Sequence, residues 1–277
     1  MFSRELLRNY AFVVIFGAMI DIHSHPLPGV DDGAQTFEVA LEMCRIAAAD
    51  GTTHLVATPH CNYQYEFRPE VNRAKLEELQ AAVGEKPKLL LGCDFHLSYD
   101  NIRQLIDGRR DFTINQTPYV LAEFGDHFIP DQIDRVFYEM ELEGLTPILT
   151  HPERNPFFLR KPDLLHHWVT RGCLVQVTAK SYTGGFGSTA RRFAERCLEE
   201  NLVHFFASDA HDTKYRPPLL SECYRKVAAR KSQEIADLLL RENPQAVING
   251  QPLPPGPEPL DPKRVKPKRS WLSFFWS

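Results

Sequence analysis

The 277-residue chain has none of the paired cysteines that mark metal knots or disulfide frameworks. Its six cysteines lie far apart, without a Cys-x-x-Cys pair, in a chain too long to need covalent cross-links. A cysteine-based phosphate loop is also excluded, because the segment between Cys61 and Arg68 is one residue too long and has no glycine. The cysteines are therefore expected to be reduced, buried thiols in a cytoplasmic protein.

The chain also lacks a basic balance and a long apolar run. Its net charge of -4 provides no overall field for nucleic acid, which is not an expected partner. The apolar run at residues 10–18 follows Arg4 and Arg8 in the manner of a short signal peptide, but it is too short to span a bilayer and no convincing cleavage site follows. Residues 1–18 are expected to be an extension upstream of a start at Met19, with a signal peptide as the alternative.

Residues 19–250 show a repeating pattern of β-prone runs and helical segments. Strand, helix, strand repetition with short connections implies parallel pairing and right-handed crossovers. The 43% hydrophobic content is enough for a sizeable core. Seven such repeats, instead of eight, predict an α/β fold that is a distorted or incomplete (β/α)7 TIM-like barrel. The predicted strands are 20–22, 54–57, 88–92, 119–123, 146–149, 173–178 and 203–207.

Residues 251–277 differ in composition from the rest of the chain. Six prolines lead into five basic residues and then into an aromatic end that includes Trp271 and Trp276. This composition predicts a linker that cannot pack. Its basic and aromatic end is expected to contact an anionic membrane peripherally or to bind a partner. A solvated tail without a fixed partner is the alternative.

Almost every predicted strand ends at a histidine or a carboxylate. His23 and His25 point to the same side of an extended segment, because side chains alternate with a period of two. A barrel gathers the carboxyl ends of its strands on one face, so residues far apart in the sequence would converge there. We therefore predict a metal centre. The candidate ligands at the strand ends are His23, His25, His60, Asp94, Glu123, His151, Asp209 and His211.

Imidazole and carboxylate ligands favour zinc, manganese or iron over calcium, and the absence of thiolates argues against a structural zinc site. Two or three ions are expected. Adjacent ions can share a carboxylate and a water whose pKa falls toward roughly 7, which indicates hydrolysis. Arg154 and Arg216 follow ligands closely, and a guanidinium matches phosphate oxygens, so a phosphate ester is the expected substrate. A plain salt bridge is the alternative role for each arginine.

Six motifs together resemble the PHP (polymerase and histidinol phosphatase) superfamily. The resemblance covers residues 19–250. More narrowly, the motifs look like those of the manganese-dependent bacterial protein tyrosine phosphatases of capsule and exopolysaccharide loci. The motifs are Asp21-Ile22-His23-Ser24-His25, Val30-Asp31-Asp32-Gly33, Ala57-Thr58-Pro59-His60, Ala122-Glu123-Phe124, Thr150-His151-Pro152-Glu153-Arg154 and Ser208-Asp209-Ala210-His211.

The resemblance implies a set of roles. Arg154 and Arg216 would bind the phosphate, and His211 or a nearby aspartate would protonate the leaving tyrosine oxygen. The substrate would be the phosphotyrosine tail of a bacterial tyrosine autokinase. One ion would be held by His23, His25, Asp94 and Asp209, a second by Asp94, Glu123 and His151, and a third by Asp32, His60 and His211.

One position departs from the family pattern, and two loops are expected to contribute to the site. The family usually has glutamate where this chain has Asp94, and His96 is a group that could compensate for the shorter side chain. The glycine-rich segment at 183–187 lacks a dinucleotide fingerprint and is expected to form a flexible rim of the site. Aromatic residues at 62–67 are expected either to stack on a substrate ring or to pack as an ordinary loop.

Two other functions fit the same residues. A phosphatase for a small metabolite, such as histidinol phosphate, would use the same barrel and metals. A non-catalytic scaffold stabilised by metal would make the C-terminal tail the functional element, although a scaffold needs no open coordination position.

Overall fold

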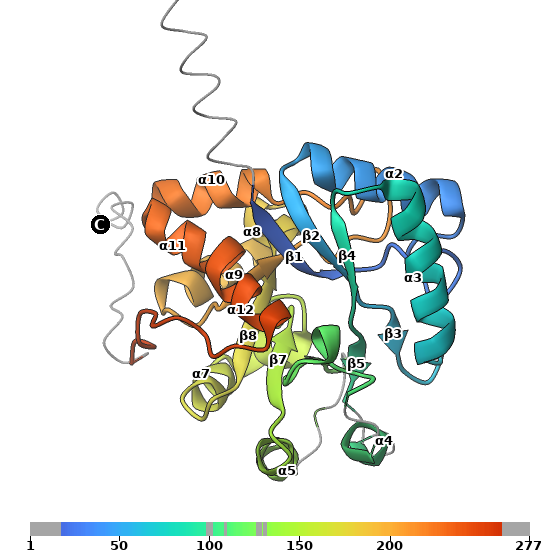
Figure 1. Cartoon of the computed structure of the whole chain (residues 1–277). Helices are drawn as coiled ribbons and strands as arrows, with labels where there is room; N and C mark the ends of the chain where they lie inside the picture. The colour runs from blue at the N-terminus through green and yellow to red at the C-terminus, as the bar shows by residue number, and fades with distance from the viewer. Residues whose placement is uncertain (1–17, 98–101, 108–109, 126–128, 130–131, 262–277) are drawn as a thin grey trace, which may run out of the picture.

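The computed structural model describes residues 18–97, 102–107, 110–125, 129 and 132–261, in which parallel strands alternate with helices (Figure 1). The strands are β1 (Met19–Ser24), β2 (Thr52–Ala57), β3 (His60–Cys61), β4 (Lys88–Leu91), β5 (Asp94–His96), β6 (Tyr119–Glu123), β7 (Thr146–Thr150), β8 (Leu174–Thr178) and β9 (Phe205–Ala207). The helices are α2 (Phe37–Ala49), α3 (Pro69–Val83), α4 (Ile102–Asp107), α5 (Ile133–Leu142), α6 (Pro156–Arg160), α7 (Asp163–Val169), α8 (Ala179–Thr183), α9 (Gly187–Glu199), α10 (Ser221–Arg230), α11 (Gln233–Asp237) and α12 (Asn243–Asn249). A short 3₁₀ helix, η1 (Ile114–Gln116), precedes β6, and a π-helical segment, η2 (Leu238–Glu242), connects α11 to α12.

The strands form two sheets, ordered β1-β2-β4 and β3-β5-β6-β7-β8-β9, and all their pairs are parallel. The prediction missed β3 and β5, which continue the second and third strands after a break. Pro59 lies in the first break and Gly92 in the second, and proline has no N–H to donate to a ladder. Hydrogen bonds from Gly92 N to Ala57 O (2.8 Å) and from Asp94 N to Pro59 O (3.2 Å) connect the chain across the breaks.

The first strand meets the segment that follows the last one. Ser24 and Ala210 form a parallel bridge, and Asp209 N donates to His23 O at 2.8 Å. His25 N donates to Ala210 O at 2.8 Å. The predicted parallel α/β class is confirmed, and this seam is held by a single bridge instead of a continuous ladder.

The helices pack on the outer faces of the strands (Figure 1). Helix α2 begins after Thr36, whose hydroxyl accepts from Val39 N at 3.3 Å and so satisfies one of the free donors of the first turn. Helix α3 begins at Pro69, a position that tolerates a missing N–H. All six residues of β1 are buried, as expected for a parallel strand covered on both faces.

The interior between the strands is apolar at one end and polar at the other. Alternate residues of a strand share a face, so Leu121 in the apolar layer is followed by Glu123, and Phe205 and Ala207 are followed by Asp209. Val247 of α12 closes the apolar end. The apolar layer consists of Ile20, Ile22, Val56, Leu90, Ile114, Tyr119, Leu121, Ile148, Phe205, Ala207, Val247 and Ile248.

Residues 251–261 correct one expectation, because this proline-rich segment does pack. The hydroxyl of Tyr119 donates to Gln251 O at 2.7 Å, and Leu260 N donates to Glu200 O at 2.9 Å. Asn201 Nδ2 donates to Glu258 O at 3.0 Å. Proline lowers the entropy of the unfolded chain, so a few hydrogen bonds can hold an extended segment in place. We call residues 251–261 the C-terminal strap.

Two expected segments lie outside the described residues. They are residues 1–17 of the N-terminal extension and the basic, aromatic end of the tail at 262–277. Among the helices that the structure does describe, none has the length and apolar character needed to cross a membrane.

Candidate metal centre

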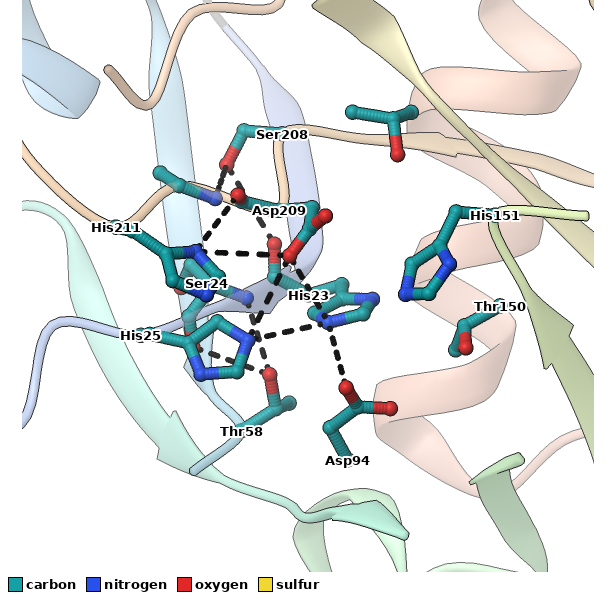
Figure 2. A network of polar contacts seen from close by, with 12 residues as sticks. His23, Ser24, His25, Thr58, Asp94, Thr150, His151, Ser208, Asp209 and His211 are labelled. Carbon is teal, nitrogen blue, oxygen red and sulfur yellow. Dashed lines mark hydrogen bonds and ion pairs between the residues drawn. The ribbon is translucent and has the colours of Figure 1, made fainter. Parts of the chain in front are cut away.

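The carboxyl ends of the strands carry a cluster of histidines and carboxylates (Figure 2). His23 lies at its centre, between His25 and His151, with Asp209 above and Asp94 below in this view. Each predicted ligand has another one near it, with nitrogen-to-oxygen distances of 3.1–3.6 Å. The structure therefore brings together all of the predicted ligands: His23, His25, Asp32, His60, Asp94, Glu123, His151, Asp209 and His211.

The tautomers of His23 and His25 follow from their outer partners. Nδ1 of His23 lies 2.9 Å from Gln176 Oε1, and Nδ1 of His25 lies 2.7 Å from Asp31 Oδ2. Because both partners accept, each Nδ1 carries a proton, so in the neutral ring each Nε2 presents a lone pair. The two Nε2 atoms face each other at 3.3 Å. Two lone pairs cannot satisfy each other, whereas a cation between them would satisfy both.

Three groups of side chains have ligand atoms that all lie within 4.8 Å of one another, a spacing that can hold a divalent ion. The groups are His23 with His25 and Asp94; His60 with Asp94 and Glu123; and His25 with Asp32, His60 and His211.

These groups differ in detail from the three predicted sets. His60 takes the place of His151 in the second group, and His151 Nε2 lies beside it, 3.5 Å from Glu123 Oε1. Asp209 lies beside the first group instead of within it. His96 is also close, with Nδ1 3.8 Å from Glu123 Oε2.

Asp94 provides the clearest test of whether these residues fit a cation. It is fully buried, belongs to two of the groups, and neither of its oxygens has a hydrogen-bond partner in the described structure. Burial raises the pKa of Asp94, but the charges of His23 and His60 hold it well below the usual value, so the side chain is a carboxylate. In their neutral forms, which are the forms that bind a metal, these two rings would leave the buried charge uncompensated, at a cost of several kcal/mol. The donor set therefore fits divalent ions.

The carboxylates also act on the histidines. Burial lowers the pKa of His23, but the charges of Asp94 and Asp209 raise it to about 9. Burial lowers the pKa of His60 as well, and the nearby carboxylates of Asp32 and Asp94 raise it to about 12. A field negative enough to hold protons on two buried imidazoles also favours a divalent cation in their place.

Arg154 and Arg216 converge on a single carboxylate. The Nη2 atom of each donates to Asp209 Oδ2, at 2.7 Å for Arg216, while Asp209 Oδ1 faces His23 Nε2 at 3.4 Å. Burial raises the pKa of Asp209, but the charges of Arg154 and His23 hold it well below its usual value. A cavity of about 350 Å³ opens at this point. It is lined by Asp32, His60, Glu123, Phe124, His151, Arg154, Asn155, Asp209, His211 and Arg216.

The backbone is specialised at these positions. His151 (φ 34°) follows β7 directly and Asp209 (φ 52°) follows β9, and both are in the left-handed region. Such conformations cost about 1–3 kcal/mol in residues other than glycine and are concentrated at functional sites. Gly33 is required for a different reason, because a Cβ there would lie 2.2 Å from the carbonyl oxygen of His25.

Three further polar residues of the site were not predicted. Asp31 accepts from His60 N at 3.1 Å in addition to its contact with His25, although only Asp32 of the same motif had been assigned a role. Gln176 is buried in β8, and a polar residue on the inward face of an apolar strand was the available signal. Glu153, also fully buried, accepts from Thr178 N at 3.1 Å.

In the aromatic loop after β3, part of the segment shows the ordinary packing that was one of the two expectations. Phe67 is buried and packs on Phe112, with ring centroids 5.5 Å apart. Tyr65 lies nearly parallel to the ring of His60, at 6.0 Å and 17°. Tyr63 is 97% exposed. Tyr63 and Tyr65 are therefore the residues of this loop that remain available to a ligand.

Comparison with known proteins identifies related sequences over most of the chain. The family profile described as "Capsular polysaccharide synthesis, CpsB/CapC" matches residues 19–249. The tyrosine-protein phosphatase YwqE of Bacillus subtilis (strain 168) is 34% identical over 261 residues, which are 93% of this chain and 100% of the relative. The tyrosine-protein phosphatase CpsB of Streptococcus agalactiae is 30% identical over 239 residues, 83% of this chain and 98% of the relative.

Solved structures agree with the sequence comparison. A structure from a set that covers YwqE from Bacillus subtilis and CpsB from Streptococcus pneumoniae, described as metal-dependent tyrosine phosphatases, matches with a TM-score of 0.80 at 33% identity, covering 88% of this chain and all of the other. The phosphotriesterase homology protein of Escherichia coli, with a TM-score of 0.54 at 11% identity over 84% of this chain and 97% of the other, shares the fold alone. The chain belongs to the CpsB/CapC family of capsular polysaccharide synthesis.

Proposed function

We propose that this protein is a metal-dependent protein-tyrosine phosphatase that hydrolyses phosphotyrosine. Asp94 carries the proposal, because a buried carboxylate without hydrogen-bond partners lies between two groups of histidines next to a cavity lined by two arginines. The relatives named tyrosine-protein phosphatases support this activity over that of a small-metabolite phosphatase or a non-catalytic scaffold.

We assign the metal-binding role to the nine clustered side chains. Asp94 belongs to two of the groups and would help to hold an ion in each, and Asp209 Oδ1, His151 and His96 lie beside these groups. Imidazole and carboxylate ligands suit manganese, with zinc and iron as alternatives. When bound, such ions lower the pKa of water toward roughly 7 and polarise phosphoryl oxygens. The proposed ligands are His23, His25, Asp32, His60, Asp94, Glu123, His151, Asp209 and His211.

The arginines are assigned to the phosphate. Without a substrate, Arg154 and Arg216 both donate to Asp209 Oδ2 at the edge of the cavity. Two guanidinium groups on one carboxylate leave donors free for phosphoryl oxygens. In the reaction a water oxygen bonds to phosphorus while the bond from phosphorus to the tyrosine oxygen breaks, and the arginines stabilise the charge on the equatorial oxygens.

His211 is better placed as a ligand than as a proton donor. Its Nδ1 lies 3.0 Å from the carbonyl oxygen of Asp209 and donates to it, so its Nε2, 3.5 Å from Asp32 Oδ1, presents a lone pair. Of the two roles expected from the sequence, we therefore propose the ligand role. Phenolate is a fairly good leaving group, so general-acid assistance is less important than the placement of the phosphate.

The biological setting follows from the family. We propose that residues 19–250 form the catalytic unit and act in the cytoplasm on the phosphotyrosine tail of a bacterial tyrosine autokinase that controls capsule or exopolysaccharide synthesis. The basic and aromatic residues at 262–277 would hold the protein peripherally at an anionic membrane.

Removal of metal tests the activity. Chelated protein is expected to lose hydrolysis of a phosphotyrosine peptide and to regain it with manganese, while zinc, iron and magnesium are tested in parallel. An Arg154→Gln variant should lose roughly 100-fold or more in kcat/KM. Arg160→Gln, on the exposed face of α6, is the matched control. Full turnover after chelation, or a tenfold preference for histidinol phosphate over the peptide, would overturn the proposal.

A further inference from the structure

Three cations surround one aromatic ring at the rim of the cavity. The guanidinium carbon of Arg154 lies 4.9 Å from the ring centroid of Phe186, and that of Arg216 lies 5.9 Å away. The ammonium of Lys180 lies 5.3 Å from the same centroid. The phosphatase reaction as proposed uses the two arginines and leaves Lys180 and Phe186 without a role.

The fold holds Lys180 and Phe186 in a fixed relation. Helix α8 ends at Thr183, and the N–H groups of Gly184 and Gly185 both donate to the carbonyl oxygen of Lys180, at 3.1 and 2.8 Å. A Cβ at position 185 would lie 2.5 Å from Cγ and Cε of Lys180, so only glycine allows the aliphatic stem to cross the loop there. The segment expected to be a flexible rim is therefore closed by hydrogen bonds, with Phe186 at its tip.

Charge is unbalanced at this rim. Arg154 and Arg216 share the carboxylate of Asp209, and Arg154 Nε also lies 4.0 Å from Glu153 Oε1, while Lys180 forms no ion pair with a carboxylate in the part of the chain that the structure describes. Asp212 is near enough for the charge of Lys180 to lower its pKa, but its Oδ1 already accepts from three backbone N–H groups of the following turn. Like charges around one ring repel each other, and an anion bound beside the phosphate would relieve that repulsion.

We propose that Lys180 and Phe186 form a subsite for a carboxylate side chain next to the phosphotyrosine, so that the enzyme prefers acidic phosphopeptides. An ammonium is a compact point charge on a flexible stem, so it can pair with a single carboxylate without the fixed fork of a guanidinium. The Phe186 ring makes cation–π contacts with the ammonium and with both guanidinium groups. This subsite rests on the proposed phosphatase function, since it takes a neighbouring residue of the same substrate.

Two phosphotyrosine peptides that differ only by aspartate or asparagine next to the phosphotyrosine test the subsite in the metal-loaded full chain. We expect kcat/KM to be about fivefold higher for the aspartate peptide than for the asparagine peptide, because its KM is lower. This preference should decline as the salt concentration rises. Lys180→Met keeps the stem and removes the charge, so it should abolish the preference by raising KM for the aspartate peptide to the value for the asparagine peptide. Lys180→Arg should restore the preference.

Lys214→Met is the matched control, because Lys214 is exposed on a neighbouring loop and should not change the preference. The proposal is wrong if the native enzyme does not discriminate between the peptides, or if Lys180→Met discriminates as well as the native enzyme does. A native enzyme that hydrolyses neither peptide would overturn the phosphatase assignment, and the subsite with it.

Discussion

At the carboxyl ends of the strands, several buried polar atoms have no hydrogen-bond partner, whereas only two such atoms in the described chain, Thr52 Oγ1 and Asn243 Oδ1, lie at the amino ends. The unpartnered atoms at the carboxyl ends include both oxygens of Asp94, Nδ1 of His60 and Oε2 of Glu153. Each such atom is costly unless something binds it. One end of the sheet is therefore built to take a ligand.

The amino ends are built differently. There, α12 and the C-terminal strap cover the apolar layer, and the strap is tied by hydrogen bonds to Tyr119, Glu200 and Asn201. In barrels of this kind, residues at the carboxyl face serve chemistry and those at the opposite face serve stability. Variants at the two ends should therefore separate activity from stability.

Asp94→Asn should give the largest effect on activity. The substitution keeps the shape but removes the charge that two ligand groups share, so we expect the protein to lose at least one bound ion. Turnover should fall by more than about 100-fold, the upper end of the loss for removing an outer partner of a ligand. Metal analysis and phosphopeptide kinetics measure both quantities. Asp94→Glu, which restores the charge, serves as the control, and an Asn variant with full metal content would contradict this role.

Asp31→Asn should have the next largest effect. Its carboxylate accepts from Nδ1 of His25 at 2.7 Å, and an amide can present its N–H₂ there and force the wrong tautomer. Metal affinity should fall roughly 10- to 100-fold while folding is retained. Calorimetric titration of the metal-free protein with manganese measures its affinity for this metal. Asp134→Asn, at a half-exposed side chain on α5, should leave it unchanged.

The sequence predicted the elements that bear strong local patterns. Predicted strands at 119–123 and 88–92 agree with β6 and β4 to within one residue, and the start of α3 at Pro69 follows from the chemistry of proline. Strands β3 and β5 were missed because they have two and three residues, too few for a period to be visible. The strap was predicted not to pack, because that prediction rested on its proline-rich composition. Composition does not show that donors on Tyr119 and Asn201, far away in the sequence, hold the segment in place.

The sequence predicted which residues come together at the candidate site. Strand-end positions and the PHP resemblance led to all nine clustered side chains. The grouping around each ion was less predictable, because it depends on which nitrogen of His23 or His25 faces inward, and that is set by their partners Gln176 and Asp31. Likewise, the ring of Phe186 beside Arg154 joins positions that no motif connects.

Shortening the chain at its C-terminus tests whether the strap at the amino ends of the strands contributes to stability. A chain that ends at residue 250 loses the hydrogen bonds from the strap to Tyr119, Glu200 and Asn201 and that from Gln251 N to Ala246 O. It should be less stable by about 2 kcal/mol than a chain that ends at residue 261. For a protein of this size that corresponds to a melting temperature lower by roughly 4–8 °C. The two chains should have the same kcat for a phosphopeptide. A change in kcat without a change in melting temperature would reverse the roles assigned to the two ends.

The titration of His204, which directly precedes β9, should have the smallest and most local effect on stability. Burial lowers the pKa of His204 to about 4, and Nδ1 of the neutral ring accepts from Val175 N at 3.1 Å. In the unfolded chain the pKa is about 6.5, so below that pH the unfolded state takes up a proton that the folded state does not.

The contribution of His204 to stability is therefore complete above pH 6.5 and is lost as the pH falls toward 4. Since the side chain is partly buried, the loss is on the order of 2 kcal/mol. Urea unfolding of metal-free protein between pH 4.5 and 7.5 should show a steeper decline for the native chain than for His204→Gln, whose amide oxygen can still accept from Val175 N. Both proteins keep the same histidines at the carboxyl ends, so the difference between their two stability profiles reports on His204 alone. Parallel profiles would show that His204 has the same pKa in the folded and unfolded states.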